Sequence, residues 1–229
     1  MNASAPTIET KGETKGETER CRIVLVAPPL ADGARLAALL TAALSGGDVA
    51  SVILDGGDLD EATFQAAAEK AVPVIQQKGA AALILNDTRI AGRSGADGIH
   101  VEGPLTEVAE TIDRHAPKLI VGAGNPRDRH SAMEIGELQP DYVFFGKLGA
   151  DNKPDPHPRN LSLAGWWSEM MQVPSIAQAG GALESAVAAA ATGADFVALG
   201  RAVFEAADPA EAVAAANRLL DEHAPRFEN

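Results

Sequence analysis

Residues 175–204, SIAQAGGALESAVAAAATGADFVALGRAVF, contain two short apolar runs separated by an alanine-rich segment. Each apolar run ends in glycine, at Gly180-Gly181 and at Gly200. This pattern is typical of a β-α-β unit in a parallel sheet. Glycines at the carboxyl ends of neighbouring parallel strands let the backbone approach a phosphate closely and turn N–H groups toward it. The segment therefore predicts phosphate binding at Gly180, Gly181, Gly200 and Arg201, with tight-turn glycines as the alternative.

The same alternation of apolar runs and helical spacing extends over the rest of the chain. Strands are expected at residues 22–27, 49–54, 81–85, 97–101, 119–121, 142–145, 175–177 and 196–199. Helices are expected at residues 32–44, 60–78, 105–115, 131–138, 161–171, 183–192 and 209–223, with a short one at 202–207. Pro73 should kink or restart the second helix. Eight β-α units predict an α/β fold, a single (β/α)8 TIM barrel whose eight parallel strands lie inside outer helices.

Length and composition exclude several classes of protein and several kinds of site. A chain of 229 residues fits one such barrel, over residues 21–229, after a polar tail at residues 1–20 that we expect to be disordered. The net charge of −13 argues against nucleic-acid binding, which depends on Lys and Arg. Cys21 is the only cysteine, so an intramolecular disulfide and a thiolate metal site are excluded. The sequence has no apolar run long enough to span a membrane, and we expect a cytoplasmic protein.

Several motifs at the predicted strand ends resemble the thiamine phosphate synthase family, which includes thiazole tautomerases. The resemblance covers roughly residues 22–223 and rests on the order and spacing of the motifs together. They are LILND at 83–87, GADGIHV at 95–101, PDYVFFG at 140–146, KPD at 153–155, AGG at 179–181 and GADFVAL at 193–199.

The resemblance implies a transferase that joins a pyrimidine pyrophosphate to a thiazole phosphate with the help of Mg2+. Asn86 would contact substrate and Asp87 would bind the metal, as in the family. The family's second metal-binding Asp falls just after His100-Val101, where this chain has Pro104 or Leu105. Glu102 is close enough to replace it as a metal ligand, in a different register. Lys153 would act on the phosphates, a role for which a solvated loop lysine is the alternative.

The chain also departs from the family pattern. The family's Gln-Leu-Arg-Asp/Glu-Lys at strand two is ILDGGD at residues 53–58, so acidic residues replace the basic pyrophosphate clamp. Gly124, which we keep as a substrate contact, stands where the family has a serine, and Arg201 replaces another serine. The pyrophosphate site therefore looks degenerate, while the phosphate site is retained.

These departures leave two other functions open. A tautomerase-like isomerase would need no metal and would use His130 or a carboxylate as acid and base, although a surface role for His130 is the alternative. A non-catalytic phosphate-ester-binding or regulatory barrel is the third reading. Asp87 has an equally good role as a helix N-cap, and His100 is expected to pack in the core.

Two further segments carry expectations of their own. Residues 147–160 form the longest irregular segment and a candidate lid over the substrates. Trp166-Trp167 should pack against the barrel or against a partner subunit in a homo-oligomer.

Overall fold

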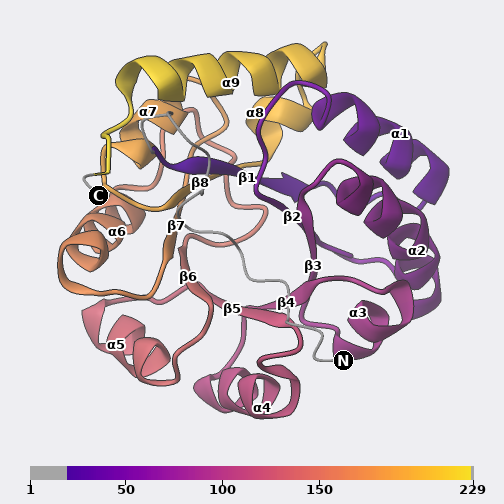
Figure 1. Cartoon of the computed structure of the whole chain (residues 1–229), viewed down its shortest axis with the longest axis horizontal. Coiled ribbons are helices and arrows are strands. Elements are labelled where there is room, and N and C mark those ends of the chain that lie inside the picture. Colours follow the sequence, from indigo (N-terminus) through magenta and orange to yellow (C-terminus); the bar gives the residue numbers. More distant parts are fainter. Residues whose placement is uncertain (1–19, 228–229) are drawn as a thin grey trace.

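The strands form a closed parallel barrel in sequential order, as the sequence predicts (Figure 1). The computed structural model describes residues 20–227, so the predicted tail lies outside the described residues except for Arg20. Pairing of the first strand with the last closes the ring, with Arg22 opposite Phe196. The strands are β1 (Arg22–Ala27), β2 (Ser51–Leu54), β3 (Ala81–Leu85), β4 (Gly98–Val101), β5 (Ile120–Gly124), β6 (Tyr142–Phe145), β7 (Ser175–Gln178) and β8 (Phe196–Leu199).

Helices follow the strands and surround the barrel (Figure 1). In the described part of the chain they are α1 (Gly33–Ala43), α2 (Glu61–Gln77), α3 (Thr88–Ser94), α4 (Leu105–His115), α5 (Arg129–Glu137), α6 (Pro158–Met170), α7 (Ser185–Ala190), α8 (Arg201–Phe204) and α9 (Pro209–His223). Within residues 20–227, no helix combines the length and apolar character needed to cross a membrane.

Two expectations about helices need correction. Of the two outcomes expected at Pro73, a kink or a restart, the restart is wrong, because α2 continues through this residue. Pro73 lies on the exposed face, where solvent can satisfy the backbone carbonyl that loses its partner. Helix α8 is shorter than residues 202–207, and its first backbone N–H is bound by a residue distant in sequence, as described below.

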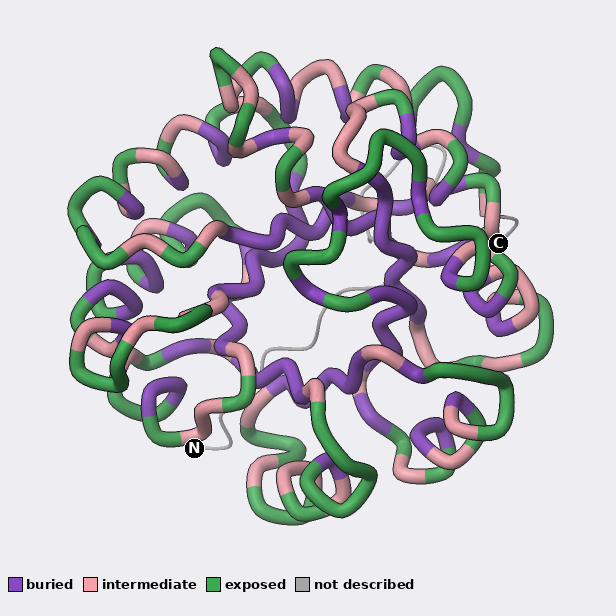
Figure 2. Tube along the Cα trace, turned by 180° about the vertical axis from the view of Figure 1, so that it is seen from behind, coloured by how far each residue is buried: buried purple, intermediate pink, exposed green. Residues whose placement is uncertain are grey.

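The strands bury side chains on both faces, because successive residues point alternately into the barrel and toward the helices. Inward-facing side chains form a separate cluster that includes Ile53, Leu83, Phe144 and Phe196. Outward-facing side chains pack against the helices in the larger cluster. In Figure 2 the strands accordingly appear as a nearly continuous buried ring. The core is filled, so a ligand site must lie at an end of the barrel.

Aspartates begin many of the helices. Each accepts hydrogen bonds from backbone N–H groups of the first helical turn, which otherwise have no partner. These N-cap residues are Asp32, Asp60, Asp87, Asp128 and Asp208. Part of the strong negative charge therefore has a structural role.

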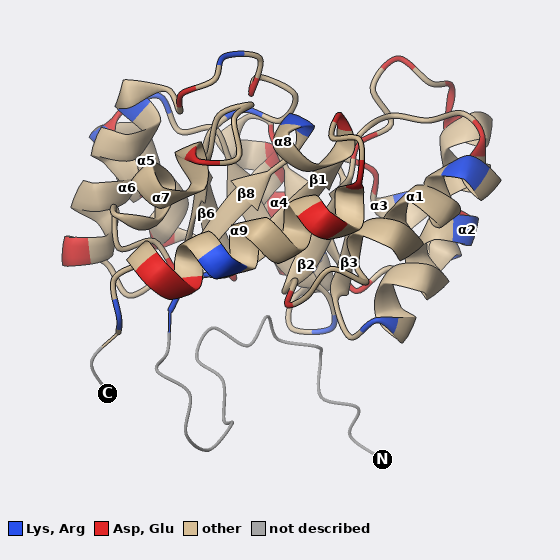
Figure 3. Cartoon of the chain, turned by 90° about the horizontal axis from the view of Figure 1, so that it is seen from above, with Lys and Arg blue, Asp and Glu red and all other residues tan. Residues whose placement is uncertain are grey.

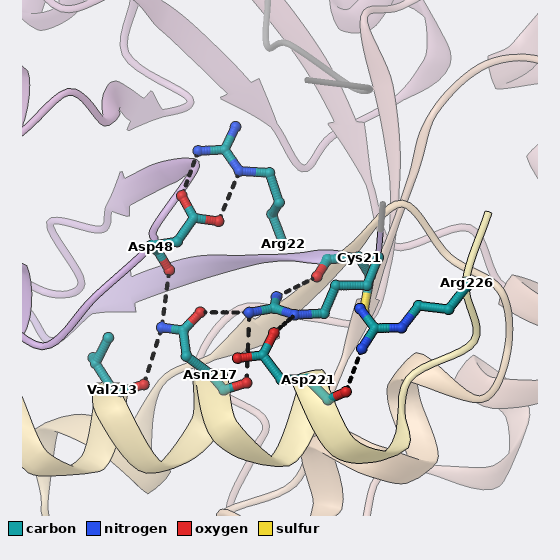
Figure 4. Close-up of polar contacts among 8 residues, drawn as sticks. Cys21, Arg22, Asp48, Val213, Asn217, Asp221 and Arg226 are labelled. Atoms are coloured by element: carbon teal, nitrogen blue, oxygen red, sulfur yellow. Dashed lines mark hydrogen bonds and ion pairs between the residues drawn. The ribbon is translucent and has the colours of Figure 1, made fainter. Parts of the chain in front are cut away.

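The two ends of the described chain are tied together at the amino end of the barrel (Figure 4). The Arg20 guanidinium donates to Asp221 Oδ1 at 2.6 Å and to Asn217 Oδ1 at 2.9 Å, both on α9. Asn217 Nδ2 donates in turn to the backbone carbonyl of Asp48. The Asp48 carboxylate accepts two hydrogen bonds from the Arg22 guanidinium, at 2.7 and 2.9 Å. These contacts join β1, β2 and α9 at the seam of the barrel.

Candidate active site

The carboxyl ends of the strands form one rim of the barrel, where sites of TIM barrels lie. In Figure 3 this rim is uppermost, and its loops carry both acidic and basic residues. Polar residues follow or end most of the strands there. They are Asp55, Asn86, Glu102, Lys147, Gln178 and Arg201.

A histidine and a tyrosine form a buried polar pair inside the barrel. His100 Nδ1 on β4 lies 2.8 Å from the hydroxyl of Tyr142 on β6, and the two rings are parallel within 4°. Phe144 packs its ring edge-on against His100, with centroids 5.2 Å apart. Gly122 makes room for the tyrosine, because a Cβ there would collide with its ring. Burial lowers the pKa of His100 to about 3 and raises the pKa of Tyr142, so both are neutral at pH 7.

The Glu102 carboxylate lies next to this pair at the mouth of the barrel. Its side chain is 13% exposed, and Oε1 lies 4.0 Å from His100 Nε2. Oε1 accepts a hydrogen bond of 2.9 Å from the backbone N–H of Leu148. Burial raises the pKa of Glu102, the Leu148 N–H and Lys147 lower it, and Asp55 raises it. The residue is therefore a partly desolvated acid with charged neighbours from β2 and β6.

Asn86 and Asp87, adjacent in sequence, have different structural roles. Asn86 adopts a left-handed backbone conformation, with φ of 56°. Its side chain accepts from the Glu102 N–H at 2.8 Å and donates to the Glu102 carbonyl at 3.2 Å, which fixes the end of β4. The Asp87 carboxylate caps α3 by accepting from the N–H groups of Arg89 and Ile90 at 2.9 and 2.8 Å. The cap predicted for Asp87 is confirmed, and its second oxygen takes no part in it.

The segment between β6 and α6, residues 146–157, covers the mouth, and we call it the β6–α6 loop (Figure 2). Leu148 is buried in the cluster inside the barrel. Lys147 is held through its backbone, because its N–H donates to Gln178 Oε1 at 2.9 Å and its carbonyl accepts from Gln178 Nε2 at 2.8 Å. The loop is thus anchored on β7 and through Leu148 on β4.

The same loop contacts the glycines after β7. The Gly181 N–H donates to the carbonyl of Lys153 at 2.7 Å, and the Gly180 N–H donates to Ser185 Oγ at 2.8 Å. A Cβ at Gly180 would collide with the carbonyl of Pro154, so glycine allows the loop to lie this close. Lys153 itself is exposed, and its contact with the glycines is made by its backbone carbonyl.

A carboxylate from this loop occupies the turn after β8. Asp151, whose side chain is 7% exposed, accepts the Arg201 N–H through Oδ2 at 2.7 Å. The Arg201 guanidinium lies 3.8 Å from Asp151 Oδ1 and donates to Glu205 at 2.8 Å. A Cβ at Gly200 would come within 2.7 Å of Asp151 Oδ2. In this conformation, the backbone N–H groups of Gly180, Gly181 and Arg201, which are predicted to hold a phosphate, are bonded to the protein's own acceptors.

The rim brings most of the predicted site residues together, but not His130. Gly124 lies beside His100 and Glu102, and the glycines of β7 and β8 share the β6–α6 loop. His130 lies on α5 with 84% of its side chain exposed, 3.8 Å from Glu134. His130 is therefore a surface histidine, which was the alternative to its role as acid and base.

The residues present do not form a resident metal cage. Among residues 20–227, no group of three or more His, Cys, Asp or Glu side chains is arranged to hold an ion. Mg2+ often binds through one or two carboxylates together with substrate phosphates. Asp87, with its second oxygen outside the cap, fits that lesser role.

Comparison with known proteins now decides the family. A family profile described as thiamine monophosphate synthase matches residues 23–203. The chain belongs to this family. A thiamine-phosphate synthase from Rhodospirillum centenum is 36% identical over 202 residues, which cover 87% of this chain and 98% of the relative. One from Hyphomonas neptunium is 32% identical over 216 residues, or 91% of this chain and 98% of that protein.

Solved structures support the fold of this thiamine monophosphate synthase family member. Thiamine phosphate pyrophosphorylase from Pyrococcus furiosus superposes with a TM-score of 0.71 at 19% identity, and the match covers 88% of this chain and 96% of that one. Orotidine 5'-phosphate decarboxylase from Pyrococcus horikoshii has a TM-score of 0.58 at 15% identity, covering 86% of this chain and 98% of that one. The barrel is therefore shared beyond the family.

Four contacts of the site were not predicted from the sequence of this family member. They involve Tyr142, Leu148, Asp151 and Gln178. Tyr142 is one aromatic residue in an apolar strand, and Asp151 is one of several acids in a long loop. Only Gln178 offered a local signal, because it is a polar residue at the end of a short apolar strand.

Proposed function

We propose that this chain is a thiamine phosphate synthase that joins a pyrimidine pyrophosphate to a thiazole phosphate. The observation that carries the proposal is the match to curated thiamine-phosphate synthases over 98% of their length at up to 36% identity. Retention of Asn86-Asp87 at the end of β3 supports it, because this pair belongs to the motif that carries the family resemblance.

The reaction requires no net proton transfer. The carbon–oxygen bond between the pyrimidine methylene and pyrophosphate breaks, and its electron pair leaves with the pyrophosphate. The lone pair of the thiazole nitrogen forms the new carbon–nitrogen bond, and the nitrogen becomes a quaternary cation. The protein must therefore hold two anionic groups, align the two rings and tolerate a growing positive charge between them.

We assign the thiazole phosphate to the backbone N–H groups of Gly181 and Arg201. Both groups are bound by the β6–α6 loop in the structure described above, through the Lys153 carbonyl and the Asp151 carboxylate. The loop has to move aside for a phosphate to take their place. We expect the ammonium groups of Lys147 and Lys153 to supply positive charge to the pyrophosphate.

Mg2+ is part of this proposal as an ion that accompanies the pyrophosphate. Asp87 would hold it through the oxygen outside the helix cap, and the remaining ligands would be phosphate oxygens and water. When bound, the ion supplies neutralising charge for the leaving pyrophosphate. A cytoplasmic location follows from the same proposal, because phosphorylated substrates are charged and are retained inside the cell.

A non-catalytic phosphate-binding barrel is the second candidate, and one observation favours it. The end of β2 carries Asp55, where the family resemblance leads us to expect a basic residue, and Asp55 accepts the Gly57 N–H at 2.7 Å in a local turn. An acid at this position repels pyrophosphate instead of clamping it.

The deciding experiment incubates the full chain with both substrates and Mg2+, and measures thiamine phosphate and released pyrophosphate by chromatography. The synthase proposal expects both products in equal amounts, loss of turnover in chelator, and loss with Asp87→Ala. Tight binding of thiazole phosphate by calorimetry, without product under any of these conditions, would identify the binding barrel instead.

A further inference from the structure

One buried polar atom at the mouth of the barrel lacks a partner. His100 Nε2 is fully buried and makes no hydrogen bond within the described residues. The other ring nitrogen is paired with the Tyr142 hydroxyl. If that hydroxyl donates to Nδ1, the neutral ring carries its proton on Nε2, and a single N–H remains unpaired. The opposite tautomer would leave two unsatisfied sites, the tyrosine hydrogen and the Nε2 lone pair.

The unpaired Nε2–H faces the Glu102 carboxylate without reaching it. Their separation of 4.0 Å exceeds a hydrogen bond, because Glu102 Oε1 is held by the Leu148 N–H of the β6–α6 loop. Gly124 leaves the space beside them without a side chain. A Cβ at that position would lie 2.6 Å from His100 Nε2 and 3.1 Å from Glu102 Cγ. A donor without an acceptor, a carboxylate and a missing side chain thus meet at one point.

Glu102 is the carboxylate best placed to face a ring at the centre of the mouth. The Asp55 carboxylate already accepts the Gly57 N–H, and the Asp151 carboxylate already accepts the Arg201 N–H. Glu102 Oε1 accepts the N–H of Leu148, which belongs to the loop that a substrate must displace. Glu102 Oε2 accepts no hydrogen bond within residues 20–227. Displacement of Leu148 would therefore free the whole carboxylate.

We propose that Glu102 is a catalytic residue of this chain, whose carboxylate contacts the thiazole ring and stabilises the positive charge that forms on its nitrogen. The proposal rests on the synthase function proposed above. A fixed anion next to a developing cation in a poorly solvated site lowers the barrier, because the interaction is stronger there than in water. The step itself is the one written above, and Glu102 neither gains nor loses a proton in it.

Tyr142 and His100 act as positioning residues behind this carboxylate. The tyrosine hydroxyl fixes the ring so that Nε2–H points at Glu102. When the β6–α6 loop withdraws the Leu148 N–H, a small rotation of Glu102 closes the 4.0 Å gap and gives both groups a partner. Loop opening is thereby coupled to orientation of the catalytic anion.

Glu102→Gln is the primary test, because it retains an acceptor for Leu148 and removes only the charge. Turnover with both substrates should fall by about two orders of magnitude in kcat, the size seen when one electrostatic contact to a transition state is removed. The KM for thiazole phosphate should change little, since the neutral ring and its phosphate do not need the charge. Glu169→Gln, at an exposed position near the end of the outer helix α6, is the matched control and should leave both constants unchanged.

Calorimetry supplies a readout that does not depend on turnover. Thiamine phosphate carries the cationic ring, so Glu102→Gln should weaken its binding about tenfold and leave thiazole phosphate binding unchanged. Tyr142→Phe should lower kcat without raising KM, and it should lose this effect in the Glu102→Gln background. If Tyr142 had only a structural role, Tyr142→Phe would lower kcat equally in the wild-type and Glu102→Gln backgrounds.

The outcomes separate this inference from the function on which it rests. A wild-type chain that turns over, with Glu102→Gln within threefold of it in kcat, would overturn the role of Glu102 and leave the synthase intact. A wild-type chain without turnover would overturn the synthase. In that case, equal binding of thiamine phosphate by wild type and Glu102→Gln would also overturn Glu102 as a ring contact, and selective loss would retain it.

Discussion

Glu102 is more easily protonated in the folded chain than in the unfolded one. Burial raises the pKa of its carboxyl above its ordinary value of 4.5, and this outweighs the opposing Leu148 N–H and Lys147. The folded state therefore binds the proton more tightly, and the free energy of unfolding falls as pH rises through the folded pKa. We predict that Glu102→Gln is more stable than wild type at pH 7 and that the difference shrinks toward pH 4. Urea denaturation at both pH values measures this, and a less stable variant at pH 7 contradicts it.

His100 gives stability the opposite dependence on pH. Burial lowers its pKa from 6.5 to about 3, so the unfolded chain takes up the proton first as the pH falls. Its contribution to stability is present above pH 6.5 and is lost between about 6.5 and 3, at up to about 1.4 kcal/mol per pH unit.

We predict that His100→Phe removes this slope, so that its free energy of unfolding changes less than that of wild type between pH 7 and pH 5. At pH 7 the variant should be less stable by about 1–3 kcal/mol, because the buried Tyr142 hydroxyl loses its partner. His115→Phe, on the outer helix α4, is the control and should keep the wild-type slope. An unchanged slope in His100→Phe would mean that other groups dominate acid unfolding.

The β6–α6 loop is the element that decides whether a phosphate can reach the rim. Its Asp151 carboxylate competes with any anion for the Arg201 N–H. Asp151→Ala should therefore tighten binding of thiazole phosphate by about threefold to tenfold, the equivalent of one net hydrogen bond. Calorimetry measures the change, and Asp155→Ala in the exposed part of the same loop serves as the control. Weaker binding by Asp151→Ala alone would show that the closed loop supports the phosphate site.

The elements themselves were predictable to different degrees. Strands such as β1 and β6 agree with the prediction to the residue, because a buried parallel strand is a short apolar run between breakers. The start of α8 could not be found in this way, since its first N–H is bound by Asp151, fifty residues earlier. For the same reason Glu102 was recognised only as a carboxylate near the expected metal. Its contact with Leu148 and its position next to His100 depend on how β4 and the loop after β6 come together in the barrel.

Barrel closure is the property of the whole molecule that local patterns predict least directly. The count of eight β-α units predicts a ring, and the pairing of β1 with β8 confirms it. At the seam, however, the ring is reinforced by Arg20, from the predicted tail, and by Asn217 on α9. The alternation of strands and helices contains no sign of this contact.

The clasp at the seam should contribute to stability without affecting the reaction, because it lies at the amino end of the barrel and the proposed site lies at the carboxyl end. Asn217→Ala removes the bond to Arg20 and the bond to the Asp48 carbonyl, which hold α9 against β1 and the start of β2. We predict a loss of about 1–3 kcal/mol in the free energy of unfolding. We expect a value in the upper part of this range, because the Arg20 side chain is only 11% exposed and would lose an acceptor.

The matched control for this variant is Arg218→Ala, which breaks the exposed ion pair with Glu211 on the same helix and should change stability by less than about 1 kcal/mol. Guanidinium denaturation and kcat, measured on both variants, complete the test. A fall in kcat for Asn217→Ala at a temperature where the chain is fully folded would show that the seam and the rim are coupled. In that case the barrel could not be treated as a rigid frame whose two ends act independently.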